Sequence, residues 1–371
     1  MTATLAPVGG PLDEPHDDVT PAARRGQRTR GIGVGILVPV AAVITALTVG
    51  GALILREGTN PFAVYGEVLR GVFVANRGLR STAIAATPLM LMATGLAIAY
   101  RARLFTIGAE GQYVIGAVAA TAWATAGGIR DLPGIVLIPT AIVIAGAAGM
   151  AWSGVTAFLN ARFRTSIVIS SLLLTYVALS IMQWAARVGI RDPESFIPAS
   201  RVIGDAGLPT VPGLNVHLGF VIALACVPVA AVVMARTRFG YRVDVLGHNA
   251  VALGANDVPP KRIMFVVLGI AGLLAGIAGY IEVAGVSQRV NGEFSTGLGF
   301  TAIIVALLGR LHPIGVAVAA LVLSGLSIGF DTAERSYDLP SSLIGVLQAL
   351  IIIFVVLGDA IAARASVSAA N

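Results

Sequence analysis

The sequence has little that could support metal or thiol chemistry. Its single cysteine, Cys226, lies inside an apolar run, which excludes an intrachain disulfide and a cysteine-based metal site. The histidines are scattered without the spacing of metal ligands; they are His16, His217, His248 and His312. We therefore expect no bound metal.

The motifs of the common hydrolases are also missing. Lys261, the only lysine, stands in Pro-Lys-Arg and not in Gly-Lys-Ser/Thr, so the chain has no P-loop and no such route to ATP hydrolysis. There is no HExxH motif and no pair of carboxylates within an apolar run. The chain is predicted to be no enzyme and to bind no cofactor, so that driven transport would take its energy from a partner.

Charge is scarce as well. Charged residues make up 12% of the chain and hydrophobic residues 56%, with a mean hydropathy of +0.87. Many runs reach about 20 apolar residues, the length that crosses ~30 Å of hydrocarbon. The net charge of +6 could indicate nucleic-acid binding, but the basic residues cluster in short loops, as membrane topology requires. We predict an all-α, polytopic protein of the cell membrane, in contact with the lipid bilayer and with no nucleic-acid partner.

The chain divides into a tail and a transmembrane domain. Residues 1–30 are polar and are predicted to be a disordered cytoplasmic tail, 31–364 the transmembrane domain and 365–371 a second cytoplasmic tail. The positive-inside rule places both termini in the cytoplasm. A helix lying on the membrane is expected at 61–73. About ten spans are expected, at residues 31–55, 82–100, 113–126, 134–158, 166–186, 217–235, 263–283, 300–308 (as part of a broken helix), 314–330 and 342–357.

A polar stretch at residues 104–112, LFTIGAEGQ, lies between two of these apolar runs, and we call it the first polar segment. It contains Thr106, Glu110 and Gln112 among glycines. Ionisable groups at membrane depth are costly and usually face protein or a water-filled path. The segment is therefore a candidate for the substrate pathway. The alternative is that its side chains cap the ends of broken helices, because orphan backbone groups there need partners.

A similar stretch, SQRVNGEFSTGLG, occupies residues 287–299 and is called the second polar segment. Its candidate pathway residues are Asn291, Glu293, Ser295 and Thr296, with the same alternative. The two segments follow runs that enter the membrane from opposite sides. This pattern predicts two inverted repeats with broken helices, as in many transporters.

The longest polar stretch of the second half is residues 236–262. Its centre, 243–255, could form a short helix that stops before Pro259 and Pro260. Such a helix could dock into a groove on a partner protein. It could equally be a solvated cytoplasmic turn.

Four stretches together resemble the permease subunits of bacterial ABC importers for branched-chain amino acids, ribose and nucleosides, and within them the nucleoside branch. The resemblance covers residues 60–359. The first polar segment is specific for the nucleoside branch, because the ribose branch has a Gly-Asp-Ser-Gly pattern there. The stretches are LFTIGAEGQ, GYRVDVLGHNAVALGAND, GFTAIIVALLGRLHPIG and LPSSLIGVLQALIIIFVVLGD.

The resemblance implies partners. They are an ABC ATPase subunit that hydrolyses ATP, a second permease subunit, and a substrate-binding lipoprotein that would meet the loops 56–80 and 187–216. The polar stretch 236–262 would be the coupling segment that docks on the ATPase. Its contact residues would be Gly247, His248, Asn249, Ala252 and Gly254.

Two alternatives to a nucleoside permease stay open. A sugar or branched-chain amino acid permease is the near neighbour. An ion-driven secondary carrier would need a titratable carboxylate deep in a span, for which Glu282 and Glu110 are the candidates.

Overall fold

The computed structural model describes residues 41–74, 77–254, 258–292, 294 and 297–368. The expected all-α architecture is confirmed: the described residues are helical or irregular, with isolated bridges and no strand. Gly51–Gln348 form one compact unit, and the described residues of a second unit are 41–50 and 349–368. The tail 1–30, the start of the first expected span, and Glu293, Ser295 and Thr296 lie outside the described residues.

Seven described helices are long and apolar enough to cross a membrane, which confirms a polytopic membrane protein. An eighth span results if the helix Ala41–Arg56 is joined with α2 (Pro61–Phe73) across a bend of 114°. Two helices are too short to cross alone: α4 (Ala109–Ala124) and α11 (Leu298–Leu308). The seven are α3 (Gly78–Arg101), α5 (Gly134–Phe163), α6 (Ile167–Trp184) with its π-turn, α7 (Leu218–Arg236), α10 (Pro260–Glu282) with its π-turn, α12 (Pro313–Tyr337) and α13 (Ser341–Ser368), in the part Ser341–Gly358.

In the second unit, the described part of the first helix has its polar groups satisfied locally. The hydroxyl of Thr45 donates to the Ala41 carbonyl at 2.8 Å, and that of Thr48 donates to the Ile44 carbonyl at 2.7 Å. Such bonds let hydroxyls reside in an apolar helix.

At the centre of the larger unit, α10 packs against α3, α4 and α5, while α12 packs against α3 and α2. Glycines make this packing close. A Cβ atom on Gly276 would overlap the Ala145 carbonyl of α5, and one on Gly279 would overlap the Tyr113 carbonyl of α4. The glycines of α10 thus let its backbone approach α4 and α5 closely. Close backbone approach of this kind gives membrane helices their packing energy.

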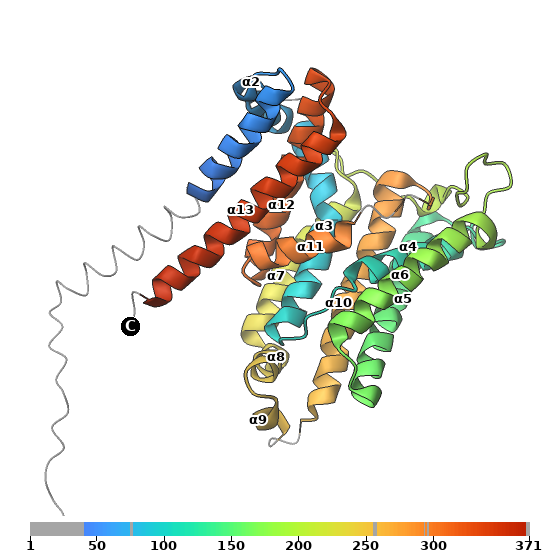
Figure 1. Cartoon of the computed structure of the whole chain (residues 1–371). Coiled ribbons are helices and arrows are strands. Elements are labelled where there is room, and N and C mark those ends of the chain that lie inside the picture. The colour runs from blue at the N-terminus through green and yellow to red at the C-terminus, as the bar shows by residue number, and fades with distance from the viewer. Residues whose placement is uncertain (1–40, 75–76, 255–257, 293, 295–296, 369–371) are drawn as a thin grey trace, which may run out of the picture. The chain divides into compact units, whose positions relative to one another are not determined.

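The ends of α3 and α5 and the polar stretch 236–262 meet at one end of this unit. The guanidinium of Arg101, at the end of α3, donates to both carboxylate oxygens of Asp244 in α8, at 3.0 and 2.9 Å. Lys261 Nζ donates to the Ala161 carbonyl at the end of α5, at 3.1 Å. Figure 1 shows α8 (Arg238–His248) and α9 (Ala250–Gly254) at this lower end.

At the other end, the long loop after α6 pairs with the chain that follows α10. The amides of Ser200, Ile203 and Leu208 donate to carbonyls of Val290, Gln288 and Ala284, at 2.8 to 3.0 Å. The start of α5 touches the same loop, since a Cβ on Gly134 would lie 2.6 Å from the Asp205 carbonyl. Loops far apart in sequence thus form one surface at this end of the unit.

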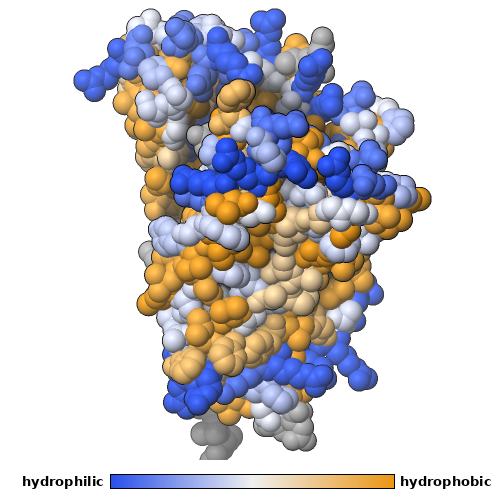
Figure 2. Space-filling model, turned by 90° about the vertical axis from the view of Figure 1, so that its right-hand side faces the viewer, coloured by the Kyte–Doolittle hydropathy of each residue, from blue (hydrophilic) through white to orange (hydrophobic). Residues whose placement is uncertain are grey.

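The side of the larger unit that carries α5 and α6 is apolar between two hydrophilic bands. Figure 2 shows this orange surface with blue residues above and below it. Its exposed side chains include Val143 and Val155 of α5 and Leu173 of α6. This distribution suits a protein surrounded by lipid.

Candidate translocation site and coupling segment

The first polar segment is held in place by hydrogen bonds to α3 and α6. The Tyr100 hydroxyl donates to the Thr106 carbonyl at 2.7 Å, and the Ile107 amide donates to Ser171 Oγ at 3.0 Å. Thr106 Oγ1 in turn accepts from the Gly108 amide at 3.2 Å. Thr106 is buried. Its hydroxyl therefore stabilises the turn into α4 and faces no open space.

Glu110 lies in the first turn of α4 and is fully buried. One carboxylate oxygen accepts a hydrogen bond from the Gly297 amide at 3.2 Å, and the other accepts from the Gly299 amide. These are the orphan amides at the start of α11, where the helix dipole favours negative charge. Glu110 thus caps a helix that begins 188 residues later in the chain.

The glycines of the second polar segment permit this contact. Gly297 has φ +82°, in the left-handed region, and forms the N-cap of α11. A Cβ atom on Gly299 would overlap the backbone of Glu110. The first turns of α4 and α11 therefore touch directly, and the two polar segments form a single buried junction. Both are short helices preceded by a polar break, as broken-helix repeats predict.

Gln112 and Tyr113 follow on α4, and both are buried. Among the described residues, Gln112 Oε1 and the Tyr113 hydroxyl have no hydrogen-bond partner. The Tyr113 ring stacks on Phe294 of the second polar segment, with ring centroids 5.3 Å apart and planes 11° from parallel. Sequence reasoning missed Tyr113 and Phe294, because an aromatic residue beside an apolar run carries no signal of its own.

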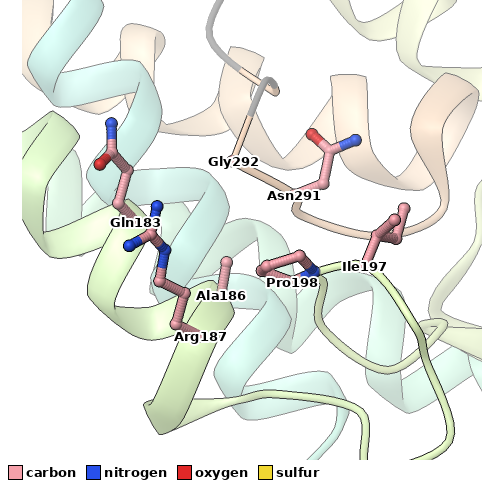
Figure 3. A pocket seen from close by; sticks show the side chains of 7 residues that line it. All are labelled: Gln183, Ala186, Arg187, Ile197, Pro198, Asn291 and Gly292. Atoms are coloured by element: carbon pink, nitrogen blue, oxygen red, sulfur yellow. The ribbon is translucent and has the colours of Figure 1, made fainter.

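Asn291 lies apart from this junction, at the outer surface. It lines a cavity of about 370 Å³ together with residues of α6 and of the long outer loop (Figure 3). In Figure 3, Gln183 and Arg187 lie on one side of the cavity and Asn291 on the other. The structure thus separates the predicted pathway residues, since Thr106, Glu110 and Gln112 are buried and Asn291 is not. The lining residues are Gln183, Ala186, Arg187, Ile197, Pro198, Asn291 and Gly292.

The polar stretch 236–262 contains two helices where sequence reasoning predicted one at 243–255. The first, α8, begins earlier because Thr237 accepts a hydrogen bond from the Gly240 amide at 3.3 Å and caps the helix. It ends at Asn249, which is extended and whose side chain accepts from the Val251 amide at 3.0 Å. This second cap starts α9.

The predicted coupling residues have different surroundings. A Cβ atom on Gly247 would overlap the Arg101 carbonyl, so this glycine is needed for packing within the chain. His248 Nδ1 lies 2.8 Å from the Asp244 carbonyl, and nothing crowds Gly254. The side chain of Ala252 lies outside the described part. Sequence reasoning missed the two most exposed apolar side chains of the region, Tyr241 and Val251.

Comparison with known proteins identifies the family. The model of the branched-chain amino acid transport system permease component matches residues 78–356. The chain belongs to this family of ABC transporter permeases. It is 33% identical to the glucose ABC transporter permease protein TsgB13 of Haloferax volcanii, over 86% of this chain and 87% of that protein. It is 30% identical to the guanosine ABC transporter permease protein NupP of Bacillus subtilis (86% and 92%) and 26% identical to the nucleoside ABC transporter permease protein NupB of Lactococcus lactis (86% and 90%).

Membership of the family confirms several expectations. The permease is a transport protein and no enzyme, it resides in the cell membrane, and ATP is hydrolysed by a partner ATPase. A substrate-binding partner is general in the family. The second alternative, an ion-driven secondary carrier, is therefore excluded. No solved structure matches the chain.

Proposed function

We propose that the permease imports nucleosides. The observation that carries this is its similarity, over nearly the whole domain, to permeases named for guanosine and for nucleosides. The first polar segment, IGAEGQ, supports the same branch. Glucose is the second candidate because of the similarity to TsgB13. Both solutes are neutral and rich in hydroxyl groups.

Transport by the reconstituted complex distinguishes the candidates. The permease, its ATPase, a second permease and the binding lipoprotein are placed in liposomes with ATP inside, and uptake of labelled guanosine, uridine and glucose is measured. ATP-dependent uptake of the nucleosides is expected. Uptake of glucose alone would replace the proposed substrate, and gradient-driven uptake without ATP would contradict the whole mechanism.

The second permease subunit is proposed to be a different chain. Bacillus subtilis has two guanosine permease proteins, of which this chain is 30% identical to NupP and 24% to NupQ. The identity of this chain to the two nucleoside permeases of Lactococcus lactis, NupB and NupC, is 26% and 23%. Its identity to the glucose permease TsgB13 of Haloferax volcanii is 33%, and to the putative glucose permease TsgC13 it is 24%. This permease thus corresponds to one member of each pair. Co-purification with a NupQ-like chain in a one-to-one ratio is expected, and a complex containing only this permease would contradict the assignment.

Residues 236–262 are proposed to dock on the ATPase. Two exposed apolar side chains, Tyr241 and Val251, support this, since 70% and 83% of their surfaces are open. Val251→Asp should reduce co-purification of the ATPase. Val188→Asp, at the opposite end and 68% exposed, is the matched control. Equal ATPase recovery with both variants would rule out docking through α9.

The pathway roles of the polar segments are revised in this proposal. We assign Glu110 and Thr106 to holding the half-helices α4 and α11 together, on the basis of their burial and hydrogen bonds. Asn291 is retained as a pathway residue at the outer cavity. The loop 187–216, which forms part of that cavity, is proposed to receive the binding lipoprotein. Both termini of the permease are proposed to lie in the cytoplasm.

A further inference from the structure

Helix α2 lies at the end of the larger unit that is opposite to the coupling segment (Figure 1). The carbonyl of Gly71 packs against Gly78, where α3 begins, whereas Arg101, where α3 ends, donates to α8. Asn60 gives α2 a defined start, because its side chain accepts a hydrogen bond from the Phe62 amide at 3.0 Å. The helix is thus a built element of this end of the unit.

Helix α2 crosses α12 and does not run along it. Four residues of α12, each about one turn after the last, contact four residues of α2: Gly325 meets Val72, Gly329 meets Val68, Thr332 meets Gly71 and Ser336 meets Glu67. In this order the α2 residues follow one another around the helix, in steps of about 40–60° at about 100° per residue. Since α12 is a span, a helix that lies across it lies roughly in the plane of the membrane.

The same contacts determine which side of α2 faces the centre of the membrane. Gly325 also lies beside Thr82, one turn inside the start of α3, so the Val72 side of α2 is the deeper side. Ser336, about three turns further along α12, donates to Glu67, so the Glu67 side of α2 faces away from the membrane centre.

The deeper side of α2 carries apolar side chains that no described residue covers. Phe62, Leu69 and Phe73, which we call the α2 apolar face, are 86%, 61% and 67% exposed. They lie about 60–100° around the helix from Val72, on the side away from Glu67. An apolar face directed towards the membrane, with charged residues on the opposite side, is typical of helices that lie in the headgroup region.

The surface of α12 beneath α2 continues this face. Ile314, Val318 and Val322 are exposed and lie on the same side of α12 as Gly325, at steps of four, four and three residues. Exposed apolar side chains of this kind suit a span that contacts lipid. Helix α2 therefore crosses a lipid-facing surface, and its apolar face points towards the hydrocarbon beside that surface.

Basic side chains follow the α2 apolar face in the chain. Arg77 and Arg80, at the start of α3, are exposed and form no ion pair with any described residue. Guanidinium groups bind phosphate oxygens through two parallel hydrogen bonds. Phosphates of lipid headgroups are the anions that a surface helix meets at this depth, and basic residues beside Phe and Leu favour binding to anionic membranes.

We propose that α2 is a membrane-surface helix of the leaflet opposite to the coupling segment. Its apolar face lies at the boundary between headgroups and acyl chains, and Arg77 and Arg80 bind lipid phosphates. Because α2 touches both α3 and α12, lipid at this site positions the ends of two spans. The sequence predicts a surface helix here, and the contacts add which face meets lipid and which spans it holds. The proposal is independent of the transported solute.

Spin labels on single cysteines test this proposal. Cys226 is the only natural cysteine, so Cys226→Ala gives a cysteine-free background. The label is attached at Leu69→Cys or Phe73→Cys, and at Arg70→Cys as the matched control, since Arg70 is the neighbouring residue and 70% of its side chain is exposed. The whole complex is placed in liposomes of phosphatidylglycerol and phosphatidylethanolamine. Power saturation then measures collisions of each label with O₂, which concentrates in hydrocarbon, and with a nickel chelate, which stays in water.

The ratio of O₂ to nickel collisions at Leu69→Cys and Phe73→Cys is expected to be at least about fivefold higher than at Arg70→Cys, because only the apolar face enters the acyl boundary. Ratios equal to that of Arg70→Cys would overturn the proposal, since the face would then be in water. Few collisions with either reagent would also overturn it, and would assign the face to a second permease or to the lipoprotein.

The role of the two arginines is tested separately. Arg77→Gln together with Arg80→Gln is expected to lower the collision ratio at labelled Phe73→Cys about twofold, because the helix is held less firmly at the headgroup level. The same label without these two changes is the control. An unchanged ratio would overturn the assignment of lipid phosphate to Arg77 and Arg80.

Discussion

The buried junction of the two polar segments and the exposed face of α6 both carry polar side chains within the membrane domain, yet they solve different problems. The polar residues of that face, Tyr176, Ser180, Gln183 and Arg187, form the α6 polar stripe, beside the exposed apolar side chains of Leu173, Val177 and Trp184. At the junction, the Glu110 carboxylate satisfies backbone amides of α11, and any side chain on Gly299 would disturb that contact. On the stripe, Gln183 and Arg187 face away from the packed protein. Polarity alone therefore does not identify a pathway; whether the polar groups are already satisfied within the chain does.

The largest effect is expected for Glu110→Ala. It leaves two backbone amides at the start of α11 without an acceptor, a buried one on Gly299 and a partly buried one on Gly297, at up to about 1–3 kcal/mol each. The complex should melt at a markedly lower temperature in detergent, as followed by size-exclusion chromatography after heating. Glu110→Gln, which keeps one acceptor oxygen, should lie between. A Glu110→Gln variant of normal stability that transports nothing would move Glu110 from the junction into the pathway.

A smaller loss of stability is expected for Gly299→Ala. The added methyl would overlap the Glu110 backbone, and overpacking of this kind costs about 1–3 kcal/mol. Gly154→Ala in α5 is the matched control, since nothing lies within 4 Å of that position. Gly154→Ala should be neutral or slightly stabilising, because alanine favours helix. Equal melting temperatures for both variants would mean that α4 and α11 do not approach this closely.

The stripe should show the opposite pattern. Gln183→Leu is expected to leave the melting temperature unchanged and to raise the KM for uptake about two- to tenfold, the equivalent of one lost hydrogen bond of about 0.5–1.5 kcal/mol. Trp184→Phe, one residue away on the apolar flank of α6, should leave the KM unchanged. Loss of stability without a change in KM for Gln183→Leu would assign the residue to packing, and the contrast between junction and stripe would fail.

Only a small effect on stability is expected at the coupling end. Arg101 and Asp244 form a partly exposed ion pair, with about a third of each side chain open, so Arg101→Ala should cost no more than about 1 kcal/mol. Its effect should appear in coupling, because the pair joins α3 to α8. Uptake per ATP hydrolysed should fall while the melting temperature barely changes. The Glu67–Arg70 pair on α2 is the control, and Arg70→Ala should alter neither quantity.

Much of the architecture could be predicted from hydropathy, because lipid requires long apolar helices whatever their neighbours are. Helix capping by Glu110 was one of the two alternatives that the sequence left open, but the capped helix could not be predicted, since the partners are backbone amides of residues 187 and 189 positions away, which leave no trace in side-chain patterns. The α6 polar stripe is visible as spacing, but only packing decides that Ser171 and Thr175 are covered and Tyr176 is open. The helix at 243–255 was misplaced because the caps at Thr237 and Asn249 are local hydrogen bonds that outweigh the apolar pattern.

The distance along the chain between Glu110 and its partner has a consequence for biosynthesis. Gly297 is synthesised 187 residues after Glu110. At about 5–20 residues per second, the carboxylate waits about 10–40 s before the backbone amide that donates to it has been made. During that time α4 cannot settle into lipid as a finished span without burying an uncompensated acid. We expect α4 to remain at the protein-lined exit of the translocation machinery until α11 emerges. In a nascent chain truncated before Gly297, the Glu110 carboxylate should therefore be accessible to water-soluble reagents that modify carboxylates. In the full-length chain it should be protected from them.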